Sequence, residues 1–396
     1  MGVASPSDGT KQAKTDAIVV GAGVVGLACA YFLKLRGLAV VLIERGIPGA
    51  ENSTKTGGGI RSQFATEPNI RLSLLSQSFW DEFASQFGVD PNFRKIGYLF
   101  LARTQGTADE LVRRVAVQRA LGVPSRALTA GQMRALHPSI ADLHSFVGGS
   151  ICMRDGYLNH HRVIQGLQRG LAGLGVDLRT GVEVTGLLKE GSRIVGVEMT
   201  EGSIESSVVV NAAGAFAGRV AATAGIDLPI VSRRHQLLIV APDRPVPDDC
   251  PWLIDIEDQV HMRPQGGGRV LVGGFLGEDA PVEPATCDAR ADPAWAVAVR
   301  KAAGRSFGLV DENSAVVASW AGLYPGTPDG YPVIEATSPG LFTAAGFAGT
   351  GLMHAPAAGR LIAEIVVDGK AQSMDISAFS STRFAGVARR REMSGF

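Results

Sequence analysis

The first fifty residues alternate apolar runs with one stretch of helical periodicity. The runs at 16–20 and 39–43 have the length and composition of buried strands. Between them Gly21-Ala22-Gly23-Val24-Val25-Gly26 opens a helical pattern that ends at Gly37, a residue type that commonly closes helices. Glu44 directly follows the second run. The pattern predicts a complete β-α-β unit.

The rest of the chain mixes both periodicities, without an internal repeat. Helical spacing predicts helices from residue 67 onward and over 107–121, 129–136, 163–174, 292–304 and 351–367. Apolar alternation predicts a strand over 95–102, a three-stranded meander over 182–188, 194–200 and 203–210, and a strand-rich region over 230–275. The chain is therefore expected to fold as an α/β (α+β) protein.

Length and charge restrict the class of protein. The 396 residues accommodate two or three domain-sized units. The 38 basic and 38 acidic residues give a net charge of +0, which argues against nucleic acid as a partner. The uncharged stretch 17–33 is short for a membrane span and contains glycines at its start, so no transmembrane segment is expected.

The cysteines predict neither a metal site nor a disulfide framework, because they lack paired spacing and zinc-type histidine partners. They are Cys29, Cys152, Cys250 and Cys287. A reducing, cytoplasmic location is expected for a soluble chain of this kind. Residues 1–14 are small and polar, so a flexible N-terminus without a signal peptide is expected.

The glycine-rich turn has the spacing of a dinucleotide-binding site. Gly21 permits the tight turn, Gly23 lets the backbone approach a pyrophosphate, and Gly26 allows close packing of helix on strand. The helix N-terminus then stabilises the phosphate charge. Glu44 is placed to accept hydrogen bonds from a ribose hydroxyl. The unit predicts a dinucleotide but does not separate NAD from FAD.

Later segments favour FAD. A simple NAD dehydrogenase would continue to alternate strands and helices, whereas this chain inserts a loop at 49–63 that is rich in glycine and hydroxyl groups. The meander then ends in Asn211-Ala212-Ala213-Gly214, and glycine-rich sequence returns at 346–351. A site built from the beginning, middle and end of the chain suits FAD, which is long enough to reach a second domain.

These residues resemble the FAD-dependent amine and amino-acid oxidoreductases of the D-amino-acid oxidase superfamily (DAO family). The likeness is greatest to its sarcosine oxidase branch, including β-subunit-like members. The motifs that carry it are Val19–Gly26, Gly57-Gly58-Gly59-Ile60-Arg61-Ser62-Gln63-Phe64, Asn211–Ala215, Trp320–Tyr324, Thr327-Pro328-Asp329-Gly330, Gly346–Gly351, Asp375–Phe379 and Arg383-Phe384. They span nearly the whole chain in the family's order.

The resemblance implies a Rossmann-type FAD-binding domain with an inserted substrate domain that contains a mixed or antiparallel sheet. The expected FAD-binding domain is discontinuous and comprises 15–90, 145–225 and 322–396. The substrate domain comprises 91–144 and 226–321. The flavin ring is expected at the junction of the two domains.

The resemblance also implies which residues bind FAD. Those in the first β-α-β unit, the glycine loop, the meander and the C-terminal segments are Gly21, Gly23, Val25, Gly26, Glu44, Arg45, Thr54, Gly57, Gly58, Gly59, Arg61, Val184, Ala213, Gly214, Gly322, Gly346, Gly349, Thr350, Gly351 and Leu352. Gly322 replaces the cysteine that carries covalent flavin in some relatives, so FAD is expected to bind non-covalently.

Several positions depart from the family pattern. Thr350 replaces a frequent histidine, and Met353 replaces a lysine that binds the substrate carboxylate in monomeric sarcosine oxidases. Leu271 replaces a lysine that promotes reaction with oxygen, so an oxidase and a dehydrogenase both remain open. His160 lies near the histidine that carries covalent FMN in some heterotetrameric relatives, although a polar helix cap is the simpler interpretation.

The expected chemistry is hydride transfer from a carbon next to nitrogen to the flavin, with the protein supplying position and charge. Arg61 is the candidate for gripping a substrate carboxylate or tuning the flavin. His261 is the candidate for tuning the protonation of the amine. Tyr324 and Phe275 are expected to line the cavity with Met353. For His261 and Tyr324 a purely structural function is equally open, and His235 is expected to be structural.

The sequence therefore predicts an FAD-dependent oxidoreductase acting on the C–N bond of an amino acid or N-alkyl amino acid. Sarcosine, glycine and proline are the model substrates. An electron acceptor or partner subunits are further expected partners. The alternative is a flavin-bound subunit or assembly factor with little amine-oxidising activity of its own.

Overall fold

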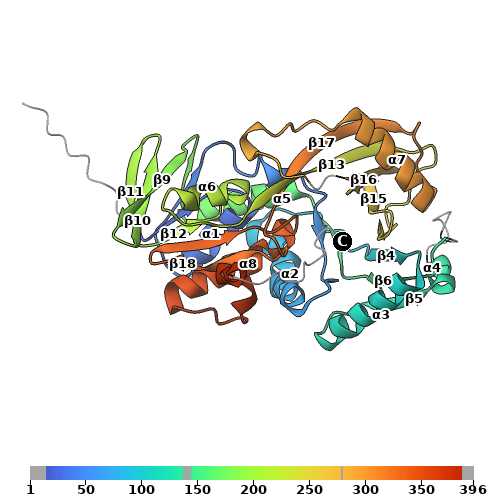
Figure 1. Ribbon diagram of the computed structural model, residues 1–396, viewed down its shortest axis with the longest axis horizontal. Coiled ribbons are helices and arrows are strands. Elements are labelled where there is room, and N and C mark those ends of the chain that lie inside the picture. The colour runs from blue at the N-terminus through green and yellow to red at the C-terminus, as the bar shows by residue number, and fades with distance from the viewer. Residues whose placement is uncertain (1–14, 137–142, 144, 278–279, 386–396) are drawn as a thin grey trace, which may run out of the picture.

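The computed structural model describes residues 15–136, 143, 145–277 and 280–385. The predicted flexible segment 1–14 lies outside these residues. Two large sheets dominate the structure, one at each end of the view in Figure 1. Helices and strands alternate around the first sheet, and the second is formed by the inserted segments of the chain.

The first sheet has six strands and is parallel except at one edge. Its order is β18 (Val333–Ser338), β19 (Leu341–Ala345), β12 (Val209–Asn211), β1 (Ala17–Val20), β2 (Val40–Glu44) and β8 (Asp177–Thr180), with only β18 and β19 antiparallel. Since parallel strands end at one edge, the residues after β1, β2 and β12 meet there. The predicted β-α-β unit is confirmed.

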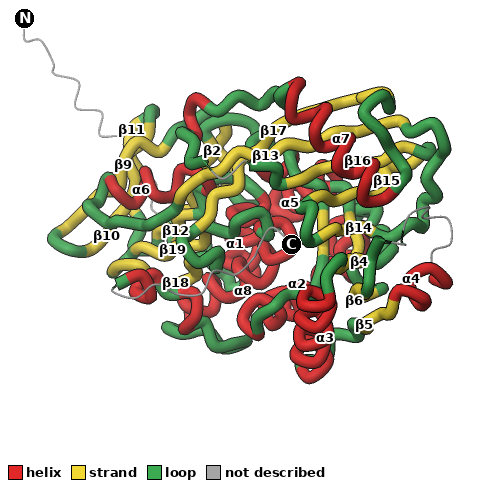
Figure 2. Tube along the Cα trace, turned by 45° about the vertical axis from the view of Figure 1, so that its right-hand side comes forward, coloured by secondary structure: helices red, strands yellow, loops and turns green. Residues whose placement is uncertain are grey.

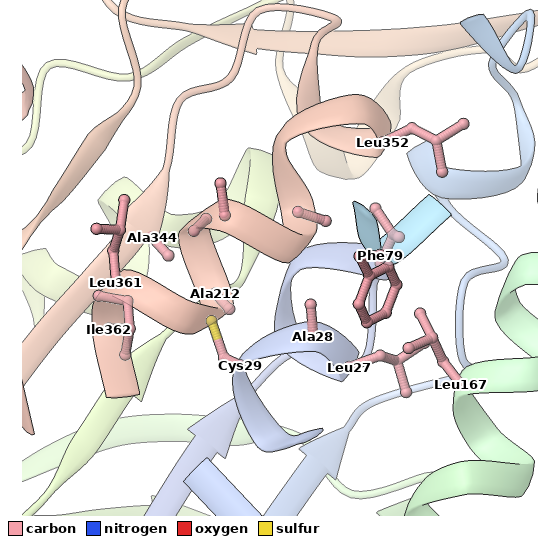
Figure 3. Packing of buried hydrophobic residues seen from close by; sticks show 14 of the residues in the cluster. Leu27, Ala28, Cys29, Phe79, Leu167, Ala212, Ala344, Leu352, Leu361 and Ile362 are labelled. Atoms are coloured by element: carbon pink, nitrogen blue, oxygen red, sulfur yellow. The ribbon is translucent and has the colours of Figure 1, made fainter. Parts of the chain in front are cut away.

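Four helices cover one face of this sheet: α1 (Val24–Leu35), α2 (Glu67–Phe87), α5 (His160–Gly173) and α8 (Gly351–Asp368). Figure 3 shows Leu27 of α1 packed near Phe79 and Leu167, whereas Leu361 lies beside Ile362 on α8. A Cβ on Gly359 of α8 would lie 2.6 Å from the Ala28 carbonyl carbon. Gly359 therefore lets the backbones of α1 and α8 touch.

The opposite face carries a three-stranded meander and a short helix, α6 (Ala217–Ala222). The meander consists of β9 (Val184–Glu190), β10 (Arg193–Met199) and β11 (Gly202–Glu205). The prediction of one strand over 203–210 was wrong, because the run divides into β11 and β12. Ser206 causes the break, since its hydroxyl accepts a bond from the Val208 amide at 3.1 Å and turns the chain into the six-stranded sheet.

The second sheet has eight strands and is mixed. Its order is β17 (Ala315–Gly326), β13 (Val231–Ala241), β16 (Arg269–Gly274), β15 (Val260–Gly266), β14 (Trp252–Asp255), β4 (Tyr98–Ala102), β6 (Gly148–Cys152) and β5 (Arg126–Thr129). Only β14 and β4 pair in parallel. Figure 2 shows α7 (Pro293–Phe307) near one end of this sheet and α3 (Gln105–Ala120) and α4 (Ala130–Leu136) near the other.

The two sheets suggest a domain division close to the expected one, which we retain as a proposal. Strand β6 lies in the eight-stranded sheet, so we propose that residues 145–152 go with the substrate domain. A two-stranded ribbon of β3 (Gly59–Ile60) and β7 (Gly156–Tyr157) joins the glycine loop to the segment after β6. In the described part of the chain, no helix has both the length and the apolar character needed to cross a membrane.

Candidate functional site

A cleft of about 430 Å³ opens where β1, β2 and β12 end. Among the predicted cofactor residues, it is lined by Gly21, Gly23, Glu44, Arg45, Val184, Ala213 and Gly214. Its walls are the glycine turn, the start of the meander and the loop from Gly49 to Ser53. The early and middle patches predicted from the sequence therefore form one cleft.

The glycines of the turn are required by the geometry. Gly21 has φ +97°, and a Cβ there would lie 2.8 Å from the Ala212 carbonyl oxygen. A Cβ on Gly26, one turn into α1, would overlap the Gly21 carbonyl oxygen. A Cβ on Gly23 would meet the Ser53 hydroxyl at 3.2 Å and narrow the cradle at the helix N-terminus. This cradle fits a pyrophosphate, which needs the close backbone approach that glycine permits.

Glu44 and Arg45 form the other end of the cleft. The Glu44 carboxylate accepts bonds from the Ala22 amide at 2.8 Å and the Gly46 amide at 2.9 Å. These bonds fix the carboxylate at the end of β2, where a ribose hydroxyl would donate to it. The Arg45 guanidinium lies 3.8 Å from the ring centre of Phe216.

The glycine loop connects this cleft to strand β17. The Asn52 side chain accepts a bond from the Leu323 amide at 2.9 Å, and the Trp320 indole donates to the Lys55 carbonyl at 2.9 Å. Thr54 donates to the Gly49 carbonyl at 2.9 Å. A Cβ on Gly322 would lie 2.9 Å from the Cβ of Lys55, so glycine is needed where the loop crosses the strand.

The turn from Gly57 to Gly59 is pressed onto the eight-stranded sheet. A Cβ on Gly57 would lie 2.7 Å from the Trp252 ring, and one on Gly59 would overlap the Tyr98 hydroxyl. Gly58 has φ +79°, and its carbonyl accepts a bond from the Leu158 amide at 3.0 Å. The absence of side chains here brings the backbone of the loop directly against the aromatic residues of the sheet.

The C-terminal glycine segment returns to the same region. Gly346 and Gly349 have φ +78° and +88°, and Thr350 precedes α8 with its hydroxyl donating to the Phe347 carbonyl at 2.7 Å. A Cβ on Gly349 would overlap the Tyr324 ring, and one on Gly351 would lie 3.9 Å from the Val25 side chain. Leu352 is buried in the first turn. The N-termini of α1 and α8 are therefore neighbours, as expected for one extended cofactor.

Arg61 lies at the end of the glycine loop and is 5% exposed. Its guanidinium donates to the Gln63 carbonyl and lies 4.0 Å from the ring centre of Phe64 and 5.5 Å from that of Phe100. Asp155 braces the next two residues, accepting from the Ser62 amide at 2.9 Å and the Gln63 side chain at 3.1 Å. The Arg61 guanidinium is therefore fixed in position by its neighbours and shielded from solvent.

Arg61 and Met353 line the same small pocket, together with Ser73, Gln77 and Trp80 of α2. Met353 is buried and its carbonyl accepts a bond from the Trp80 indole at 3.2 Å. Both residues were predicted separately as site residues, and the structure places them at one pocket. The next residue, His354, is fully buried, and its ring nitrogen Nε2 lies 2.8 Å from the Ser73 hydroxyl.

The other predicted site residues form a partly exposed aromatic group. Phe275 and Tyr324 have ring centres 6.2 Å apart, and His235 contacts both at 4.5 and 4.4 Å. His261 lies 6.5 Å from Phe275 and accepts a bond from the Trp252 indole at 3.3 Å through Nδ1. His235 was expected to be structural, yet it lies in the middle of this group.

The surroundings of His261 and Tyr324 determine their protonation states at neutral pH. Burial lowers the pKa of His261 to about 3, assisted by Arg263 and His235. Burial raises the pKa of Tyr324 to about 12, with Arg61 opposing the shift. At neutral pH the site therefore presents a neutral imidazole and a protonated phenol next to a cation.

His160 is the first residue of α5, so the predicted start at 163 was three residues late. The Asn159 side chain, which accepts from the Arg162 amide at 3.1 Å, caps this helix. The pKa of His160 is lowered to about 4, chiefly by burial and further by the neighbouring charges of His161 and Arg263. The His160 Nδ1 is buried and has no hydrogen-bond partner among the residues that the structure describes. The cap is therefore Asn159, and covalent FMN at His160 stays a prediction.

Sequence reasoning missed several residues of the cleft. Asn52 and Ser53 were quoted only as part of the loop, although a hydroxyl or amide near a phosphate cradle is a usable signal. Leu323 was included only in the Trp320–Tyr324 motif, and Phe216 and Arg219 had no sequence signal, because only the fold brings them to the cleft. Among the described residues, no three His, Cys, Asp or Glu side chains could hold a metal ion.

Comparison with known proteins agrees with this geometry. The family described as DAO, FAD dependent oxidoreductase, matches residues 16–365. The chain belongs to this family. It is therefore an FAD-dependent oxidoreductase, as predicted, and the fold is the expected one.

Individual relatives in the DAO family have low sequence identity to this chain but match it over nearly its whole length. Glycine oxidase from Geobacillus kaustophilus is 29% identical over 382 residues, covering 94% of this chain and 97% of the relative. Sarcosine oxidase subunit beta from an Arthrobacter species is 27% identical over 376 residues, covering 93% and 91%. The crystal structure of L-proline dehydrogenase from P. horikoshii has a TM-score of 0.85 and 28% identity, covering 94% of this chain and 98% of that one. This likeness covers both sheets.

Proposed function

We propose that this DAO-family protein oxidises the C–N bond of an amino acid or N-alkyl amino acid related to sarcosine, glycine or proline. The flavin supplies the hydride acceptor at N5, and the resulting imine hydrolyses in water. The observation that carries the proposal is the buried Arg61 at the end of the FAD loop, whose charge acts on Tyr324 of the aromatic group. The names of the relatives agree, since glycine, sarcosine and proline all bear a carboxylate next to nitrogen.

Each residue of the site is proposed to have its own function in substrate binding. Arg61 binds the carboxylate through charge-assisted hydrogen bonds, and Phe275 and Met353 close the apolar side of the site. Tyr324, which keeps its proton, donates a hydrogen bond. His261 stays neutral and orients the amine rather than taking its proton. The buried charges of Arg61 and Arg263 disfavour an ammonium ion nearby, which promotes the reactive free amine.

FAD is proposed to bind without a covalent bond. Gly322 offers no sulfur at the place where some relatives carry cysteine, and none of the four cysteines lines the cleft. The buried Leu271 supplies no charge where some oxidases carry a lysine that promotes reaction with oxygen, so we propose another acceptor alongside oxygen. Partner subunits are proposed from the likeness to a protein named as a subunit.

The test is anaerobic titration of the yellow holoprotein with sarcosine, glycine, proline and other N-alkyl amino acids. Bleaching of the flavin absorbance by one of them supports the proposal, and admission of air then reports whether oxygen is the acceptor. Failure of every amine to bleach a flavin that dithionite reduces would favour the second candidate, a flavin-bound subunit or assembly factor. The observation behind that candidate is Met353, which lacks the charge of the lysine in monomeric sarcosine oxidases.

A further inference from the structure

Arg263 is a buried cation where the eight-stranded sheet meets the FAD loop. It lies on β15 and is 4% exposed. Its Nε donates to the Gly57 carbonyl at 2.9 Å, across the junction. Its Nη1 donates to the Pro264 carbonyl at 2.7 Å and the Gln265 side chain at 2.6 Å. The side chain therefore spans from the sheet to the back of the glycine turn.

Its charge is balanced without a carboxylate. The guanidinium carbon lies 4.0 Å from the ring centre of Tyr157 and 5.4 Å from that of Trp252. No ion pair within the described residues includes Arg263. Burial lowers its pKa to about 10, so it remains charged at neutral pH. A buried charge that only carbonyl dipoles and rings compensate is costly, and its positive field extends into its surroundings.

The positive charge of Arg263 lies close to the expected path of the cofactor. Arg263 pairs in the β-ladder with Leu271, and both side chains lie on the sheet face that includes Trp252 and Tyr98. The turn from Gly57 to Gly59 is pressed onto that face. Asn52 and Ser53 line the cleft, and the loop that holds them continues into this turn, so we infer that a dinucleotide starting at Glu44 runs along it. The backbone of one glycine turn thus separates Arg263 from the path of the cofactor.

We propose that Arg263 stabilises the anionic form of reduced FAD through the Gly57–Gly59 turn and raises the reduction potential of the bound cofactor. Reduction by hydride adds two electrons and one proton and leaves one negative charge on the ring, which a nearby buried cation favours. Arg263 acts through the field and the turn, so it is a positioning and tuning residue. The proposal needs bound FAD but does not depend on which amine is oxidised.

The experiment measures the midpoint potential of bound FAD against reference dyes in Arg263→Gln and Arg263→Lys holoprotein. Gln keeps a donor for the Gly57 carbonyl but removes the charge. We expect it to disfavour reduction at least tenfold, a drop of about 30 mV for a two-electron couple. Lys keeps the charge, so we expect the reduction potential of Arg263→Lys to drop by less than half as much as that of Arg263→Gln. Arg269→Gln, on the exposed part of neighbouring β16, is the control and should leave the potential unchanged.

Three outcomes would overturn the proposal. An unchanged potential in Arg263→Gln would exclude an electrostatic effect, and equal losses in Gln and Lys would assign the effect to the shape of the turn. If the variants fail to retain FAD, the wild-type protein still provides a test. Its reduced spectrum should stay that of the anionic flavin from about pH 8 down to about pH 6, because the cation opposes protonation. Protonation of the reduced flavin within that range would contradict the proposal.

Discussion

Replacement of Arg61 by Met tests how the site recognises its substrate. Met retains the apolar length that contacts Phe64 and Phe100 but removes the guanidinium. The arginine is 5% exposed, so its hydrogen bonds to a carboxylate are shielded and are worth about 1.5–3 kcal/mol. With about 1.4 kcal/mol for each factor of ten, the substrate dissociation constant should rise between about 10- and 150-fold.

The assay is rapid anaerobic mixing of holoprotein with the substrate found in the amine panel, which yields the dissociation constant and the rate of flavin reduction separately. The same amine without its carboxylate, for example pyrrolidine in place of proline, serves as the control ligand and should lose little affinity. Arg154→Met is the matched protein control, because Arg154 lines the same small pocket but is exposed. An equal loss for both ligands, or release of FAD, would refute carboxylate binding by Arg61.

Three other changes test the fold and its electrostatics. Gly26→Ala should abolish FAD binding, since the new methyl overlaps a backbone carbonyl, whereas Gly106→Ala on the surface of α3 meets no atom and should bind FAD normally in a fluorescence titration. Burial raises the pKa of Asp155 from 3.8 to about 6, so the folded protein binds this proton more tightly than the unfolded chain. Stability should therefore fall as pH rises from 4 toward 6, by no more than about 3 kcal/mol, and urea unfolding of Asp155→Asn should lack this slope. Arg383→Met should cost about 3–5 kcal/mol in the same unfolding assay, because it strands buried Asp329, whose oxygens accept from the guanidinium at 2.8 and 3.1 Å; an unchanged midpoint would contradict this value.

Local patterns predicted the elements whose periodicity agrees with their burial. The run over 16–20, the glycine turn and the following helix agree with β1 and α1, because strand, turn and helix each have a strong local signal. The run over 203–210 was misassigned because both of its halves have strand character. Only the hydrogen bonds of Ser206 reveal that the chain changes sheets there.

Contacts between distant segments limited the prediction of the site. Arg61 and the glycine patches could be found because glycine and arginine are chemically conspicuous in a loop. His235 and Arg263 have no local signal of that kind. Their functions depend on which rings and carbonyls the sheet brings to them, such as Tyr324 beside His235 and Gly57 beside Arg263.

The backbone contact between α1 and α8 has a consequence for biosynthesis. The helix that supports the pyrophosphate cradle rests on Gly359, and the strand β19 that flanks β12 is made of residues 341–345. A growing polypeptide that has not yet emerged through α8 therefore lacks these supports of its coenzyme pocket. Stable loading with FAD must wait until translation has passed α8, which makes coenzyme retention a report of completed synthesis.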